Sequence, residues 1–117
     1  MTPDEFRELA LALPDVSEGA HMGHADFRVG GKIFATLGYP DADHGVVILP
    51  ADAQQEYLKA RPATFGAASG AWGERGATNV RLSALDVQVA SDALESAWRK
   101  RAPKRLTKQF DHPHPRS

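Results

Sequence analysis

The sequence predicts an α+β domain, an antiparallel sheet of four to five strands with helices packed mainly on one face. Three observations support this fold class. Apolar residues recur at helical spacing near both ends of the chain. Between these segments, short runs alternate apolar and polar side chains, as half-buried strands do. Glycine follows the first two of these runs, so neighbouring strands are expected to be joined by turns and to pair antiparallel.

Length and composition limit the protein to one domain. The chain has 117 residues, 42% of them hydrophobic and 25% charged, which suits a single folded core. It contains no cysteine, so disulfides, thiolate metal sites and cysteine nucleophiles are excluded. The acidic start has no signal-peptide core, and no apolar run approaches the roughly 18 residues of a membrane span. We expect a cytoplasmic protein with no membrane partner, one domain over residues 1–110 and a flexible tail over 111–117.

The N-terminal segment predicts a helix. Thr2-Pro3-Asp4-Glu5 forms a capping box with proline at the first helical position. The apolar residues that follow recur at helical spacing and are Phe6, Leu9, Ala10 and Leu13. Pro14 is expected to end the helix.

Two antiparallel strands are expected next. Residues 25–29 and 32–37 alternate in polarity, and Gly30-Gly31 between them supplies the positive φ angles of a tight turn. The alternation predicts a buried face made up of Ala25, Phe27, Val29, Ile33, Ala35 and Leu37. A third strand over residues 46–49 is apolar throughout, which fits either a central strand covered on both sides or a strand packed against a helix.

The second half of the chain predicts a helix over residues 52–61, a strand over 78–82 and a final helix that Pro103 ends. Ser83 with Asp86 is expected to cap that final helix. Its predicted inner stripe consists of Val87, Ala90, Leu94, Ala97 and Trp98. Leu106 and Phe110, four residues apart, are expected to dock one further short turn.

Residues 63–76 are rich in glycine. Gly70, Gly73 and Gly76 precede a strand, whereas a phosphate-binding fingerprint places its glycines between a strand and a helix. We therefore expect a second hairpin or flexible wing here, without a packed helix. Trp72 within it could lie against nucleic acid or cover the core, and the sequence leaves both readings open.

Charge is distributed unevenly along the chain. Residues 1–98 hold 7 basic and 14 acidic side chains, whereas residues 99–117 hold 7 basic and 1 acidic. A basic end can serve an acidic partner such as nucleic acid, or it can be a solvated terminus that also stabilises the last helical turn. The face of the sheet opposite the helices is expected to stay open and to carry Arg28, Lys32, Phe34 and Arg81.

Metal chemistry has weaker support. Glu18, His21 and His24 would share one face of a helix, but the glycines between them disfavour a helix. His112 and His114 could add ligands only from the expected tail. The acids near the first helix also offer oxygen ligands for a hard cation, and they are Asp4, Glu5, Glu8, Asp15 and Glu18.

Three segments resemble the MmcQ/YjbR family, namely HADFRVGGKIFATL at residues 24–37, AWGERGATNVRL at 71–82 and AWR at 97–99. The likeness covers about residues 3–103. It implies an α+β fold of the kind shared with the bacterial frataxin homologue CyaY, and a double-wing mode of DNA binding. The wings would be the hairpin from Arg28 to Lys32 and the segment from Trp72 to Arg75. The resemblance brings no catalytic residues.

The leading hypothesis is therefore a small DNA-binding or DNA-associated protein, a monomer or weak homodimer, that contacts double-stranded DNA with little sequence specificity. It needs no metal or cofactor and is not an enzyme. The residues expected to contact nucleic acid are Arg28, Lys32, Trp72, Arg75, Arg81, Arg99, Lys100 and Lys104. The alternative is a frataxin-like metal-binding or protein-interaction domain that uses the acids of the first helix and His21 or His24.

Overall fold

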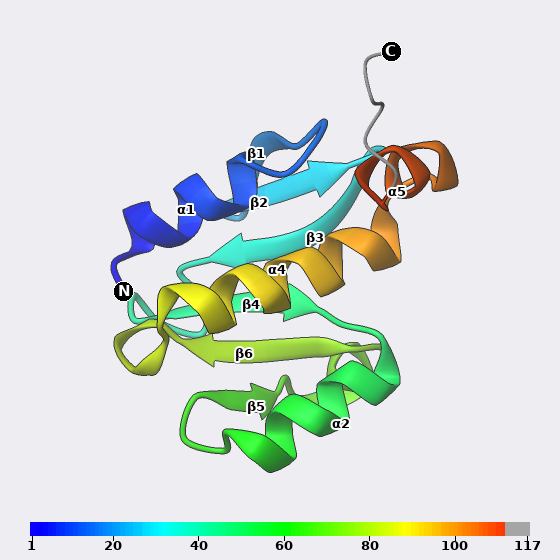
Figure 1. Ribbon diagram of the computed structural model, residues 1–117. Helices are drawn as coiled ribbons and strands as arrows, with labels where there is room; N and C mark the ends of the chain where they lie inside the picture. The colour runs from blue at the N-terminus through cyan, green and yellow to red at the C-terminus, as the bar shows by residue number, and fades with distance from the viewer. Residues whose placement is uncertain (112–117) are drawn as a thin grey trace.

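The computed structural model describes residues 1–111 and confirms the α+β class, with one more strand than the upper expectation. All neighbouring strands pair antiparallel in a six-stranded sheet of order β1-β2-β3-β4-β6-β5 (Figure 1). The strands are β1 Ser17–His21, β2 His24–Val29, β3 Lys32–Leu37, β4 His44–Ile48, β5 Phe65–Ala67 and β6 Ala77–Arg81. The predicted central strand is confirmed, because β4 lies between β3 and β6.

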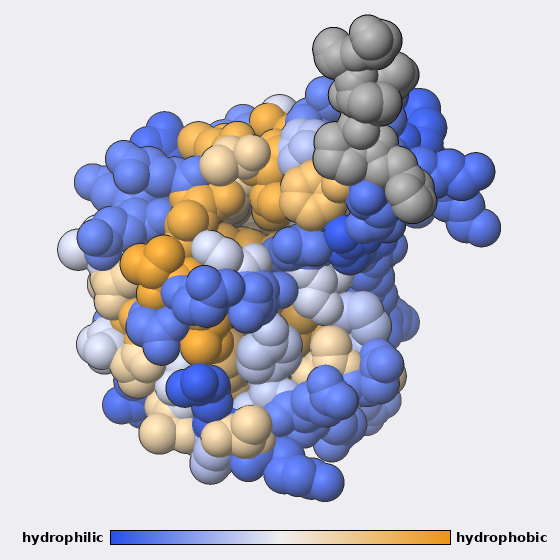
Figure 2. Space-filling view, viewed as in Figure 1, coloured by the Kyte–Doolittle hydropathy of each residue, from blue (hydrophilic) through white to orange (hydrophobic). Residues whose placement is uncertain are grey.

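Most helices lie on one face of the sheet. The helices are α1 Pro3–Leu11, α2 Ala51–Ala60, α3 Gly70–Glu74, α4 Val87–Arg101 and α5 Lys104–Asp111, with a 3-10 turn at Leu82–Ala84. Figure 1 shows α1, α4 and α2 covering the same face. Figure 2 shows this side as mostly hydrophilic, with apolar side chains gathered where α1 lies beside α4. In the described part of the chain, no helix is both long enough and apolar enough to span a bilayer.

The helix caps follow from the sequence, with one exception. The Glu5 amide donates to Thr2 Oγ1 at 3.1 Å and the Thr2 amide donates to Glu5 Oε1 at 2.8 Å, which is the predicted capping box. Asp86 caps α4 by accepting from the Val89 amide at 2.9 Å. Ser83 instead binds the side chain of Asp43, so its predicted capping role is wrong. Val87 is also not on the inner stripe, since it is 57% exposed.

The C-terminal elements pack around Trp98, as predicted. Trp98 is fully buried, and its Nε1 donates to the carbonyl of Pro14 at 3.0 Å. Leu106 is buried, and the ring of Phe110 lies 5.2 Å from that of Trp98, so both dock as expected. Helix α5 extends to Asp111, which the sequence analysis placed in the tail. The rest of the predicted tail, with His112 and His114, lies outside the described residues.

Strand β1 was not expected. It forms a two-residue hairpin with β2 in which Met22 and Gly23 adopt φ angles of 51° and 81°. Such a turn normally carries asparagine or glycine at its first position. Methionine at this position does not indicate a turn, so the hairpin could not be predicted from the sequence. Most of β1 is exposed, which removes the alternation that identifies a strand.

A bulge changes the face on which Phe34 lies. Phe27 pairs with Ala35 and Arg28 pairs with Ile33, so Phe34 is an extra residue in β3. Phe34 is fully buried in the main core together with Ala35. The expectation that Phe34 would lie on the open face is therefore wrong, because the alternation predicted from sequence does not continue through a bulge.

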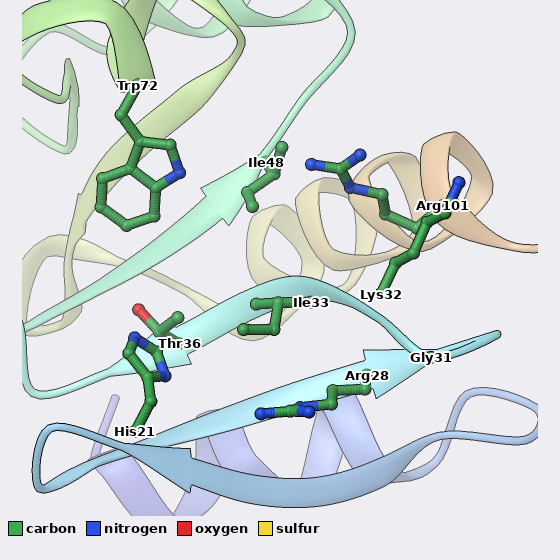
Figure 3. Close-up of a pocket in the computed structure, with 9 residues that line it drawn as sticks. All are labelled: His21, Arg28, Gly31, Lys32, Ile33, Thr36, Ile48, Trp72 and Arg101. Atoms are coloured by element: carbon green, nitrogen blue, oxygen red, sulfur yellow. The ribbon is translucent and has the colours of Figure 1, made fainter.

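Helix α3 corrects the expectation of a second wing without a packed helix. The segment pairs with β6 only over Phe65–Ala67, and Gly70–Glu74 then turns into a short helix. Gly73 lies so close to the residue after β5 that an added Cβ would stand 1.7 Å from the Ala68 carbonyl oxygen. Helix α3 carries Trp72 across the sheet face opposite α4 (Figure 3). This face is therefore partly covered.

Candidate functional site

The face opposite α4 holds a hollow of about 400 Å³ beneath Trp72 (Figure 3). Ile33 and Ile48 give it an apolar floor on β3 and β4. Its polar lining comes from segments far apart in the sequence and consists of His21, Arg28, Lys32, Thr36 and Arg101. The sheet brings β1, β2 and β3 side by side, α3 supplies the roof, and the end of α4 supplies Arg101.

A buried carboxylate orders one wall of this hollow. Asp26 is fully buried and accepts from Arg28 Nε at 2.8 Å and Arg28 Nη2 at 3.1 Å. It also binds His21 Nδ1 at 2.8 Å. The hydrogen bond from Arg28 is the main reason why the pKa of Asp26 falls from its usual 3.8 to about 2, which outweighs the opposing effect of burial. Asp26 is therefore ionised at neutral pH and balances the charge of Arg28.

Two polar atoms in the lining of this hollow are buried and have no hydrogen-bond partner in residues 1–111. They are Thr36 Oγ1 and Arg101 Nε. A buried polar group without a partner costs about 1–3 kcal/mol, so native proteins keep few of them. Both line the same hollow, and a ligand bound there could satisfy them.

A second hollow of about 370 Å³ adjoins the first. His21, Thr36 and Trp72 line both, and Met22, His24 and Tyr39 complete the second. The Tyr39 ring centroid lies 6.3 Å from that of Trp72 and 6.1 Å from that of His24. Within the described residues this is an aromatic cluster outside the main core. No sequence pattern marks Tyr39, since it follows a strand in a turn-rich loop.

Several of the predicted nucleic-acid residues gather around the first hollow. Arg28, Lys32 and Trp72 line it. Lys100 Nζ donates to the carbonyls of Leu49 at 3.0 Å and Arg75 at 2.8 Å, which connects α4 with the end of α3. Desolvation at this position lowers the pKa of Lys100. Lys100 thus joins two segments. These two hydrogen bonds leave its ammonium less available for a phosphate than expected from the sequence.

Lys104 follows Pro103, which packs on the β2–β3 turn. A Cβ added at Gly30 would lie 3.1 Å from Pro103 Cδ. The start of α5, with Lys104, therefore lies beside the hairpin that carries Lys32. The residues expected to contact nucleic acid did not include Arg101, which lies in the basic C-terminal part of the chain and lines the hollow.

Arg81 and Arg99 lie apart from the hollow. Arg81 pairs with His44 at the opposite end of β4 and β6 from Ile48, and both line a smaller hollow there. Arg99 Nε binds Glu95 at 2.9 Å, and its guanidinium binds Asp111 at 2.6 and 3.1 Å. These two carboxylates neutralise Arg99. The structure therefore brings together part of the predicted set and separates these two residues from it.

The residues proposed for a metal have other partners. Glu18 accepts from Arg7 Nε at 2.6 Å, and His21 binds Asp26. Glu5 belongs to the cap of α1. Within residues 1–111, no three His, Asp or Glu side chains gather in a way that could hold a metal ion.

Comparison with known proteins gives one family and one solved structure. A family model described as YjbR matches residues 11–100. The crystal structure of Deinococcus radiodurans protein DR2400, described with the domain DUF419, is similar with a TM-score of 0.74 and 16% sequence identity. The match covers 96% of this chain and 89% of that one. No curated protein matches the chain. At this identity, the structural likeness concerns the fold alone.

Proposed function

The chain belongs to the YjbR family, and from this premise we propose that it is a DNA-associated protein that contacts the phosphate backbone with the cations around the hollow under Trp72. The DNA-binding mode implied by the family resemblance supplies the class of partner. The proposed role is one of binding without catalysis, and the expected cytoplasmic location is part of this proposal.

One observation supports the proposal, which is that two cations from distant segments line one hollow. Lys32 from β3 and Arg101 from α4 line the same hollow. Arg75 is the C-cap of α3, the helix that carries Trp72, and Lys104 begins α5 beside the β2–β3 turn. None of these four side chains forms an ion pair with a carboxylate in the described residues. Unpaired cations on one surface are what a phosphate backbone requires.

The two proposed wings differ from each other in structure. The first is the β2–β3 turn, and the second is the helix α3 with Trp72. Arg28 in the first wing is held by Asp26, so Lys32, Arg75, Arg101 and Lys104 carry the phosphate contacts. Contacts to phosphates position a protein on DNA without reading its sequence. We therefore expect weak binding with little sequence preference.

The salt dependence of binding tests this proposal. With four phosphate contacts, the logarithm of the association constant should fall against the logarithm of salt concentration with a slope of about −3.6. Lys32→Ala and Arg101→Ala should each weaken binding and bring the slope closer to zero by about 0.9. Fluorescence anisotropy with a labelled 20-base-pair duplex at four salt concentrations measures both effects.

Lys59→Ala is the matched control, because Lys59 is an exposed lysine on α2 that lines neither hollow. It should leave the slope unchanged. Absence of binding at low salt, or an equal effect of all three substitutions, contradicts the proposal.

A further inference from the structure

We propose that the two adjoining hollows form one binding site for a single unpaired nucleotide, with the base among the aromatic rings and the phosphate among the cations. The inference rests on the proposed DNA-associated function for its class of ligand, and it goes further by assigning a pocket to one nucleotide. It begins from the shared lining of the two hollows, since His21, Thr36 and Trp72 contribute to both. Each hollow is near the lower limit of the roughly 300–1,000 Å³ typical of small-molecule sites.

The second hollow suits a base. Tyr39 lies between Trp72 and His24, with ring centroids 6.3 and 6.1 Å away. Aromatic side chains that are not packed into a core are the usual stacking partners of unpaired bases. Tyr39 is 45% exposed and Trp72 is 38% exposed, so both rings can be reached from solvent.

Met22 adds an unusual feature beside these rings. It is 91% exposed at the tip of the β1–β2 hairpin and has a φ of 51°. A left-handed backbone is unfavourable for an unbranched side chain such as methionine, and a large exposed apolar side chain gains nothing from the core. Its place in the lining of the second hollow gives it a partner once a base is bound.

The first hollow suits a phosphate. Lys32 and Arg101 line it, and Arg101 Nε is a buried donor that has no acceptor in the described residues. Figure 3 shows the Arg101 guanidinium pointing toward Ile48. A guanidinium presents several N–H donors in one plane, which matches the geometry of phosphate oxygens.

Thr36 lies where the hollows meet. Its side chain points into the shared space beside His21 and toward Trp72 (Figure 3). Thr36 is 2% exposed and its Oγ1 has no partner, although a hydroxyl can both donate and accept. Because the ionised Asp26 can only accept, His21 Nδ1 carries its proton toward Asp26 and leaves Nε2 for a ligand. Thr36 and His21 can therefore bind the sugar between base and phosphate.

The combination of the two hollows selects the class of ligand. An inorganic anion would fill only the cationic part, and an uncharged aromatic compound would fill only the other. A nucleotide fills both. In an intact duplex the bases are stacked and paired, so only an unpaired or extruded nucleotide could enter.

Calorimetry with the full chain tests the site with three probes at low salt, which are deoxyadenosine 5′-monophosphate, deoxyadenosine and inorganic phosphate. We expect the monophosphate to bind at least tenfold more tightly than either fragment. Trp72→Leu should weaken its binding at least tenfold through loss of stacking. Lys59→Ala should leave binding unchanged.

Thr36→Val gives the sharpest result, because it removes the hydroxyl and keeps the branched shape. It should weaken binding of the monophosphate about tenfold. It should also raise the melting temperature of the free protein by about 3–5 °C, since the unpartnered buried hydroxyl is gone. A role of Thr36 in folding alone would instead lower the melting temperature and leave binding intact.

Two results overturn the proposal. Equal binding of phosphate and the monophosphate means a phosphate site without a base pocket. Binding of the duplex with the expected salt slope, but not of the monophosphate, refutes the nucleotide site and leaves the DNA-associated function standing. Binding of the monophosphate without any binding of DNA supports the site and refutes that function.

Discussion

Replacing Asp26 with asparagine is expected to lower the free energy of unfolding at pH 7 by about 2–3 kcal/mol. Asp26 is fully buried and accepts two hydrogen bonds from Arg28 and one from His21. The asparagine side chain has no charge and can accept through only one of its two terminal atoms. Urea-induced unfolding followed by circular dichroism measures the change.

The effect of Asp26→Asn should depend on pH in a defined direction. The folded-state pKa of Asp26 is about 2, below its usual value of 3.8, so the unfolded chain takes up the proton first as the pH falls. The stability that the carboxylate provides is complete above about pH 5 and is lost as the pH falls from 4 through 2. The difference between wild type and variant should therefore shrink when unfolding is repeated at pH 2.5.

Glu56→Gln provides the matched control, because Glu56 is an exposed carboxylate on α2 that forms no ion pair within residues 1–111. Its effect on stability should stay within about 0.5 kcal/mol at either pH. A constant difference between wild type and Asp26→Asn from pH 7 to pH 2.5 would show that the charge of Asp26 does not stabilise the fold.

Asp26 also controls the charge of the candidate DNA surface. Once Asp26 is neutral, Arg28 is free to contact a phosphate, so the variant should bind duplex DNA more tightly and with a salt slope steeper by about 0.9. A less stable protein that binds better separates this role from general unfolding. The same anisotropy titration measures it, and an unchanged slope would mean that Arg28 stays outside the interface.

Local sequence patterns predicted most of the fold because most elements obey local rules. The capping box of α1, the Gly30-Gly31 turn and the apolar β4 all require only residues close in the sequence. Phe34 departs from its pattern because a bulge places two successive residues on one face, and no local signal marks that extra residue. Strand β1 could not be predicted for a related reason, since a short exposed edge strand shows no alternation of apolar and polar residues.

The candidate site was harder to predict because it forms between segments that are far apart in the sequence. Arg28 was correctly assigned to the open face, but its pairing with Asp26 depends on full burial of that carboxylate between β1 and β3. Arg101 and Tyr39 reach the two hollows from opposite parts of the chain. The glycines before β6 were interpreted as hairpin bends, whereas Gly73 allows close contact between two backbones.

Gly73→Ala is expected to produce the largest change, lowering the free energy of unfolding by at least about 3 kcal/mol. The new Cβ would lie 1.7 Å from the Ala68 carbonyl oxygen and 2.7 Å from its carbon. Both are backbone atoms, so no change of side-chain rotamer relieves the contact, and α3 must move away from Ala68, the residue after β5. Urea-induced unfolding measures the loss.

This movement should also remove Trp72 from the roof of both hollows. Binding of deoxyadenosine 5′-monophosphate should weaken by at least tenfold if the nucleotide site exists, and tryptophan emission should shift to longer wavelength. Trp98 is fully buried beneath Pro14 and Phe110, so the shift reports on Trp72.

Gly66→Ala is the control, because its added Cβ meets no atom within 4 Å and its φ is not positive. If Gly73→Ala matched Gly66→Ala in stability and emission, α3 would not be held against Ala68, and the hollows would lack the roof on which both proposals depend.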